Sequence, residues 1–288
     1  MAVFAASALT ATACGTATTS TSSVAATRAT DPASQTSAAT ASSSSGSSAS
    51  SSSSSSATTP SAAASRLNPA LAGKTVVIDP GHNGGNASHA AEINKLVPMG
   101  FGQYKTCDTT GTNADDGYPE YEFTLSVSVL VQQILEQHGA KVVMTRTTND
   151  GVGPCVDQRA AIGNEYHADA AISIHGDGFD ASGHGFQIIQ ATKSVGGTAN
   201  DARSNALSQA LHTTFLSESG LTPATYIGTD GYETRSDLAG LNLSTVPKVL
   251  VECGNMKNPG DIALMESPAG RERIAQAIAD GIIGYLTR

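Results

Sequence analysis

Four ionisable side chains stand where a predicted strand ends or a predicted helix begins. His82 follows the run TVVIDPG, His175 follows AAISI, and Glu252 follows KVLV. A further acid, Glu120 or Glu122, opens a long helical pattern. A catalytic zinc ion takes three imidazole or carboxylate ligands and keeps one position for water, whose proton a free carboxylate accepts. These residue types therefore predict a metal-assisted hydrolase.

Each of these residues also has an ordinary interpretation. His82 could be a turn residue, and His175 could simply follow a buried strand. Glu252 is the strongest signal, because a carboxylate that ends an apolar central strand is partly desolvated and needs a charged partner. A serine nucleophile is disfavoured by the lack of a G-x-S-x-G elbow in the sequence. The stretch HAAE, His89 to Glu92, matches the ligand pair of zinc carboxypeptidases but lies in a loop-like context.

The elements that must position these residues alternate between strand and helix. Helical patterns run from Phe123 to His138, from Val156 to His167, from Asn200 to Ser217 and along the stripe Ile274 to Leu286. This alternation predicts a single α/β domain with a twisted, mainly parallel or mixed sheet and helices on both faces. The predicted strands are rich in Val and Ile and are Thr75–Ile78, Lys141–Thr145, Ala170–Ile174, Gly185–Gln190 and Lys248–Cys253.

The span from His82 to Tyr118 is rich in glycine and has no clear periodicity. A loop of this length inside a compact domain is usually functional or mobile. We therefore expect it to lie over the site, held in place by Cys107.

Composition divides the 288 residues into three parts. Residues 1–16 are apolar and short, residues 17–66 are almost wholly Ser, Thr and Ala, and residues 67–288 have the composition of a folded domain. A Ser/Thr/Ala tract buries too little apolar surface to offset its ordering entropy, so we expect a disordered linker. The net charge of −9 and the lack of Trp argue against a nucleic-acid partner.

The first residues, MAVFAASALTATACG, resemble the apolar core of a signal peptide that ends at a bacterial lipoprotein site. We expect export to the periplasm or cell envelope. Cys14 is a candidate for lipidation, which would anchor the chain to the outer face of the plasma membrane; an ordinary cleaved signal is the alternative. Cys107 and Cys155 both lie in loops and are expected to form a disulfide, whereas Cys253 lies in an apolar strand as a free thiol.

Four stretches follow one another between Lys74 and Leu286: VVIDPGHNGG, EYEFTLSVSVLVQQILEQHGAKVVMTR, RAAIGNEYHADAAISIHGD and VPKVLVECGNMKNPGDIALM. Together they resemble the zinc-dependent N-acetylmuramoyl-L-alanine amidases of bacterial cell-wall turnover, and most closely the mycobacterial-type members. Asn83 is an addition to the commonest form of the first motif, and Asp177 replaces the usual Asn of the third.

The resemblance implies a role for each of the four ionisable residues. His82, a glutamate at the start of the first long helix, and His175 would bind one Zn²⁺ per chain, and Glu252 would be the catalytic acid/base. Glu120 is preferred to Glu122 as the middle ligand, because it places two apolar residues of the helix in the register of the family.

The resemblance also implies an activity, the hydrolysis of the amide between N-acetylmuramic acid and the L-Ala of the stem peptide. The partners would be peptidoglycan or muropeptide fragments, and the chain would act as a monomer. Arg235 is a candidate for binding a peptide carboxylate, since arginine offers bidentate geometry. Two alternatives stay open, a non-catalytic peptidoglycan-binding homologue and a zinc carboxypeptidase that acts on wall peptides.

Overall fold

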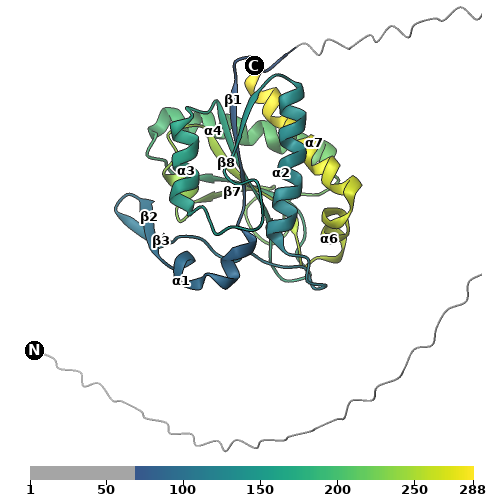
Figure 1. Cartoon of the computed structure of the whole chain (residues 1–288). Helices are drawn as coiled ribbons and strands as arrows, with labels where there is room; N and C mark the ends of the chain where they lie inside the picture. The colour runs from purple at the N-terminus through teal and green to yellow at the C-terminus, as the bar shows by residue number, and fades with distance from the viewer. Residues whose placement is uncertain (1–68) are drawn as a thin grey trace, which may run out of the picture. The chain divides into compact units, whose positions relative to one another are not determined.

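A six-stranded sheet forms the centre of the computed structural model, which describes residues 69–288 (Figure 1). The predicted signal segment with Cys14, and the linker of residues 17–66, lie outside the described residues. Four adjacent strands pair in parallel, the strand Gln187–Ala191 is antiparallel to the strand Lys248–Asn255, and the strand Tyr232–Arg235 is parallel to Gln187–Ala191. This confirms a mixed, mainly parallel sheet. In spatial order the strands are β4 Lys141–Met144, β1 Thr75–Pro80, β5 Ala170–Asp177, β8 Lys248–Asn255, β6 Gln187–Ala191 and β7 Tyr232–Arg235.

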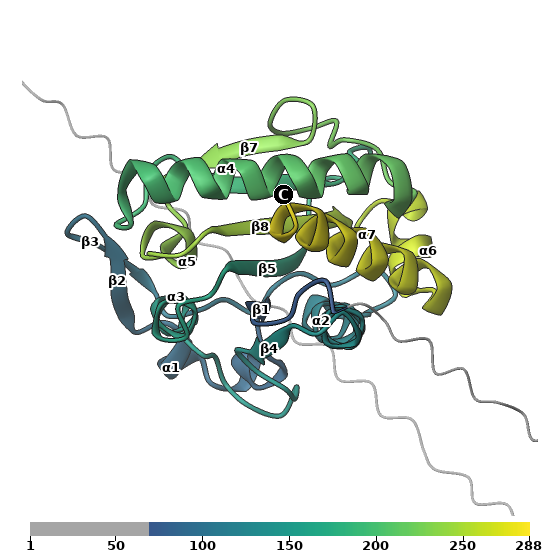
Figure 2. The same ribbon diagram turned by 90° about the horizontal axis from the view of Figure 1, so that it is seen from above.

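Helices cover both faces of this sheet, as Figure 2 shows for α2 and α7 on one side and α3 and α5 on the other. On the first face, α2 (Glu120–Gln137), α4 (Gly197–Thr214) and α7 (Pro268–Leu286) pack on the larger core cluster. On the second face lie α3 (Val156–Glu165) and α5 (Ala239–Asn242). The domain therefore has three layers with the sheet in the middle.

Alternation along each strand decides which side chains reach the second face. Val76 and Ile78 of β1 belong to the large core beneath α2, whereas Val77 belongs to a small cluster with Ile162 of α3. Asp79 therefore lies on the side of α3. The register Asp79↔Ser173 and His175↔Glu252 places polar side chains of β5 and β8 on this same side.

The span from His82 to Tyr118, predicted as a loop over the site that Cys107 holds in place, does line the cavity beside His82 through residues of the segment 105–109, but it is not wholly a loop. The span contains a 3₁₀ turn, Gly84–Ser88, a short helix α1, Ala90–Ile93, and an antiparallel hairpin formed by β2, Leu96–Gly100, and β3, Gln103–Thr106. The hairpin turns through three residues with positive φ at 100–102. Its strands are short and only partly buried, with Met99 the one buried side chain, so no hydrophobic alternation reveals the hairpin in the sequence.

Other boundaries also differ from those predicted. The sequence patterns indicate neither β7 nor α5 nor a helix α6, Pro259–Glu266, because all three are short. Helix α4 begins three residues before the predicted Asn200 and continues into a π-helical turn, Phe215–Ser219. Within residues 69–288, no helix combines the length and apolarity needed to cross a membrane.

Candidate metal centre

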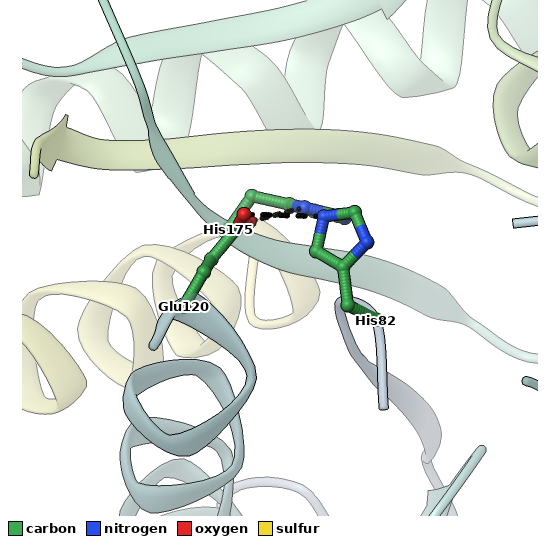
Figure 3. A group of neighbouring side chains, drawn as sticks. All are labelled: His82, Glu120 and His175. Carbon is green, nitrogen blue, oxygen red and sulfur yellow. Dashed lines mark hydrogen bonds and ion pairs between the residues drawn. The ribbon is translucent and has the colours of Figure 1, made fainter. Parts of the chain in front are cut away.

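Three of the predicted site residues converge at the carboxyl ends of the parallel strands (Figure 3). His82 follows β1, His175 lies in β5, and Glu120 is the first residue of α2. One donor atom from each lies within 4.8 Å of the others. The carboxylate of Glu120 is central, because its Oε2 is 3.2 Å from His82 Nε2 and its Oε1 is 2.9 Å from His175 Nδ1.

The backbone around His82 is held in an uncommon conformation. His82 has a φ of 55°, in the left-handed region that non-glycine residues rarely occupy. Arg159 supports this turn from one side by donating to the carbonyl oxygens of Pro80 and His82, at 2.6 and 3.1 Å. Arg146 supports it from the other side by donating to Gly81 O at 2.9 Å and to Tyr121 O at 3.0 Å. Arg146 therefore ties the end of β1 to the first turn of α2.

Glu120 rather than Glu122 faces the two histidines. Its side chain is buried and accepts hydrogen bonds from the backbone N–H groups of Thr112 and Gly176, at 3.0 and 3.2 Å. Glu122 is exposed to solvent. Successive helical residues are rotated by about 100°, so two glutamates two positions apart point to nearly opposite sides.

Glycines leave the room that these side chains need. A Cβ atom on Gly81 would overlap the imidazole of His175. A Cβ atom on Gly111, which has a φ of +76°, would lie 2.7 Å from Glu120 Oε2 and 2.8 Å from a ring carbon of His82. Both positions are closed to any larger residue unless the site moves.

The electrostatics of the three residues favour a bound cation. Burial disfavours a charge on His82, but Glu120 and Asp108 outweigh it and raise the pKa of His82 to about 10. Burial also disfavours a charge on Glu120, yet His82 and His175 hold the pKa of that carboxyl well below its usual range. Two imidazole nitrogens and one carboxylate oxygen are the donor set of catalytic zinc sites, and donors at about 2 Å from a tetrahedral ion are separated by roughly 3.3 Å. The residues present thus fit a metal ion of this kind.

Glu252 stands next to this group on β8, in register with His175. Its Oε2 atom is buried and has no hydrogen-bond partner in the described part of the chain. Burial raises the pKa of Glu252 well above its usual value, and the negative charges of Glu120 and Asp177 raise it further. A buried carboxylate without a partner is costly, so this atom is available for an external donor such as water.

Sequence reasoning missed a buried ionic cluster directly behind the site. Asp79 receives hydrogen bonds from Thr145 Oγ1 at 2.7 Å, Arg159 at 2.8 Å, Ser173 Oγ at 3.0 Å and Lys248 Nζ at 3.0 Å. The side chains of Lys248 and Asp79 are each 2% exposed. The available signal was the same one that identified Glu252, a carboxylate at the end of a buried strand.

Asp108 was also missed. One of its oxygens is 3.3 Å from His82 Nδ1 and the other is 3.2 Å from Arg159. Its sequence neighbours form a loop without periodicity, so only its place beside Cys107 could have drawn attention to it.

The structure joins the two loop cysteines, Cys107 and Cys155, in a disulfide, as the sequence indicates, and Cys253 is a buried free thiol. Asn83, which the motif comparison leaves unexplained, acquires a role. Its side chain is buried, accepts from Gly84 N at 2.9 Å to cap the 3₁₀ turn, and donates to Gly153 O at 2.8 Å. It fastens the loop after β1 to the segment that leads to the disulfide.

Three further residues that the sequence analysis singled out lie away from the three converging side chains. Arg235 ends β7, and its Nε and one terminal nitrogen donate to Asp237 at 2.8 and 2.6 Å. Two of its three guanidinium nitrogens are therefore already paired. His89 binds Gly85 O, and Glu92 is exposed. Within residues 69–288, neither His89 nor Glu92 is part of a group with metal-site geometry, so the geometry does not support the carboxypeptidase motif.

A cavity of about 250 Å³ adjoins the converging side chains. His82, His175 and Glu252 line one part of it, and apolar side chains of the α5 region, among them Leu238 and Leu241, line another. A pocket with an apolar wall and a few convergent polar groups is what a small-molecule or peptide site requires.

Comparison with known proteins supplies the context for this geometry. Residues 76–284 match the protein family described as N-acetylmuramoyl-L-alanine amidase. An N-acetylmuramoyl-L-alanine amidase of Mycobacterium tuberculosis is 42% identical over 226 residues, which span 78% of this chain and 91% of that protein. The crystal structure of the amidase Ami1 from Mycobacterium abscessus is 49% identical with a TM-score of 0.71, and the match covers 75% of this chain and all of that one. Ami1 from Mycobacterium smegmatis is 44% identical with the same TM-score, over 75% of this chain and 98% of that one.

Proposed function

The chain belongs to the N-acetylmuramoyl-L-alanine amidase family, and we propose that it hydrolyses the amide between N-acetylmuramic acid and the L-alanine of peptidoglycan stem peptides. We propose further that His82, Glu120 and His175 hold one zinc ion. The observation that carries both statements is the convergence of these three side chains beside the unpartnered carboxylate oxygen of Glu252. When bound, zinc supplies Lewis-acid chemistry, since it polarises a carbonyl group and lowers the pKa of water.

Glu252 is the proton carrier in this proposal. Its buried Oε2 accepts a proton from the attacking water, and its raised pKa allows the carboxyl group to keep that proton until the leaving nitrogen needs it. The hydroxyl of the water joins the carbonyl carbon, the C–N bond breaks, and Glu252 gives its proton to the nitrogen. The products are a muramic carboxylic acid and a peptide with a free amino terminus. General acid/base catalysis of this kind typically contributes roughly 10²–10⁴-fold.

The cavity beside Glu252 is the proposed place for the part of the substrate next to the scissile amide. Its apolar wall suits the lactyl and alanyl methyl groups on the two sides of that bond. Arg235 stays a proposal for binding a peptide carboxylate. Its third guanidinium nitrogen has no hydrogen-bond partner within residues 69–288 and would make that contact.

Export to the cell envelope follows from the same proposal, because the substrate lies outside the plasma membrane. The disulfide between Cys107 and Cys155 supports this location, since such bonds persist in oxidising compartments. Lipidation of Cys14 stays a prediction on a residue outside the described part of the chain.

The decisive experiment compares the parent protein with Glu252→Gln and with a control, Glu122→Gln. Glu122 is also a glutamate of the active-site end of the domain, but it is exposed on the first turn of α2. Each purified protein is assayed for zinc content and incubated with muramyl dipeptide and with peptidoglycan fragments, with and without a chelator. Mass spectrometry identifies the products.

We expect about one zinc ion per chain in all three proteins. Glu252→Gln should lose roughly 10²–10⁴-fold in rate while Glu122→Gln keeps the parent rate. Full activity of Glu252→Gln would refute its role as proton carrier. A parent that binds peptidoglycan without releasing peptide would support a non-catalytic homologue, and release of single terminal amino acids would support a carboxypeptidase.

A further inference from the structure

We infer that Asp108 is a positioning residue for the metal ligand His82, and that Arg159 and the Cys107–Cys155 disulfide keep Asp108 in that place. The inference rests on the proposed metal centre and adds to it a named residue outside the ligand set. It starts from the juxtaposition of the Asp108 carboxylate with the ring nitrogen of His82 that faces away from Glu120.

The surroundings of His82 Nδ1 decide where the imidazole proton lies. The backbone oxygen of Thr109 is 3.1 Å away, and Oδ1 of Asp108 is 3.3 Å away. A carbonyl oxygen and a carboxylate oxygen can only accept, so Nδ1 holds a proton toward them. Nε2 lies 3.2 Å from Glu120 Oε2, on the side where the donor atoms converge, so it is the nitrogen that would give up its proton and bind a metal ion while Nδ1 keeps its own.

This arrangement is how metal-binding histidines are commonly oriented. Such a histidine usually donates its other N–H to a carboxylate or carbonyl group, which fixes the ring and makes the ligating nitrogen more basic. His82 has both kinds of acceptor, from adjacent residues of one loop. His175 differs, because its Nδ1 itself faces Glu120 Oε1 at 2.9 Å, and no hydrogen-bond partner is found for its Nε2 within the described residues. An outer carboxylate therefore supports one of the two histidines only.

Both carboxylate oxygens of Asp108 have a partner that holds the side chain in place. Oδ1 accepts a hydrogen bond from Thr109 N at 2.7 Å, and Oδ2 is paired with Arg159 at 3.2 Å. The residue is only 5% exposed. The same guanidinium group donates to the backbone oxygens of Pro80 and His82. One arginine thus fixes both the carboxylate and the turn that carries the imidazole, so their relative position is set.

The disulfide fastens the two segments that carry this pair. Cys107 directly precedes Asp108, and Cys155 directly precedes α3, on whose first turns Arg159 lies. Val156 N also donates to Cys107 O at 2.7 Å. The covalent link and the backbone hydrogen bond keep the loop and the helix together, so the Asp108–Arg159 contact does not depend on one ion pair alone.

The test measures zinc affinity rather than catalysis. The zinc dissociation constants of the purified parent, Asp108→Asn and a control, Asp115→Asn, are measured by competition with a chromophoric chelator. Asp115 is an aspartate of the same interval before α2, but its side chain is 81% exposed and it pairs with Lys257 at 3.0 Å. Asp108→Asn should bind zinc 10–100-fold more weakly, the usual cost of losing such a partner, and Asp115→Asn should stay within twofold of the parent.

Equal zinc affinity of Asp108→Asn and the parent would overturn the inference and leave the metal centre intact. A parent that binds no zinc would overturn the metal centre and this inference together. Circular dichroism of the zinc-free proteins checks that the variants are folded.

A measurement on the parent keeps the inference testable if Asp108→Asn does not fold. Long-range ¹H–¹⁵N correlation spectra of the zinc-loaded protein with labelled histidine should show His82 bound to zinc through Nε2 and protonated at Nδ1. Zinc bound to His82 through Nδ1 would overturn the inference, because that nitrogen could then donate no proton to Asp108.

Discussion

The buried ionic cluster behind the metal centre leads to a specific prediction for Asp79→Asn. The amide keeps the size of the carboxylate but removes its negative charge. Arg159 still has Asp108 as a counter-charge, whereas Lys248, with a side chain that is 2% exposed, pairs with no other carboxylate in the described residues. The variant therefore leaves one buried ammonium group uncompensated.

The expected loss follows from that single uncompensated charge. Breaking a buried ion pair by removing one partner costs about 3–5 kcal/mol. We expect the lower part of this range, because Thr145 and Ser173 contact different oxygens of Asp79, so one hydroxyl can still donate to the amide oxygen and the other can accept from the amide nitrogen. Urea unfolding at pH 7 is the assay. With a slope of roughly 3 kcal/mol/M, a loss of 3 kcal/mol lowers the midpoint by about 1 M. A loss below 1 kcal/mol would refute the account of this cluster.

A double variant separates the buried charge from general damage. Asp79→Asn combined with Lys248→Met removes both charges, and replacing a buried pair with apolar groups is often close to neutral. We expect the double variant to be at least about 1 kcal/mol more stable than Asp79→Asn alone. A double variant that is less stable than Asp79→Asn would show that Lys248 contributes through its packing and not through its charge.

Acid should act through the same residue. Burial disfavours the charge of Asp79, but Lys248 and Arg159 outweigh burial and hold its pKa well below the usual value. A group whose pKa is lowered by folding stabilises the protein above its unfolded pKa, about 3.9, and that contribution is lost as the pH falls below this value. The free energy of unfolding of the parent should therefore fall more steeply below pH 4 than that of Asp79→Asn. Parallel curves would contradict this assignment.

Two further predictions concern the space and the covalent link at the site. Gly81→Ala would push its methyl group into the ring of His175, so a zinc titration should show affinity lower by at least about tenfold; unchanged affinity would contradict the close packing. Gly284→Ala in α7 adds a methyl group that meets open space, so urea unfolding should show a free energy of unfolding higher by roughly 0.5–1 kcal/mol. Replacing Cys107 and Cys155 with serine opens a loop with a sequence separation of 48, which costs about 4 kcal/mol in chain entropy; urea unfolding measures it, and a loss under 1 kcal/mol would argue against the bond.

The parts of the fold that the sequence predicts are those with strong local signals. β1, β5 and β8 are buried on both faces, so they appear as continuous Val- and Ile-rich runs. The carboxyl ends of parallel strands share one edge of a sheet, and this alone predicts that His82, His175 and Glu252 come close together. β7, with the sequence YETR, shows the opposite case. It joins the sheet through backbone pairing with β6, which its polar composition does not reveal.

The choice between Glu120 and Glu122 illustrates the limit of local reasoning. Both lie on the first turn of one helix, and their difference arises from how α2 is rotated against β5. Arg146 helps to set this rotation through Tyr121 O, but it lies on the loop after β4. The position of Asp108 is likewise decided by contacts with residues far along the chain, so no pattern within its own loop could have assigned it a role.

The long sequence separation within the site has a consequence for biosynthesis. Asp79 and Lys248 are 169 residues apart, and β8 is the last strand to leave the ribosome. A growing chain contains all three proposed ligands well before it contains Glu252 or the lysine that neutralises Asp79. Unfinished or truncated chains thus carry the proposed metal ligands without the proposed proton carrier. On the proposed mechanism, a chain that stops before β8 should therefore lack hydrolytic activity.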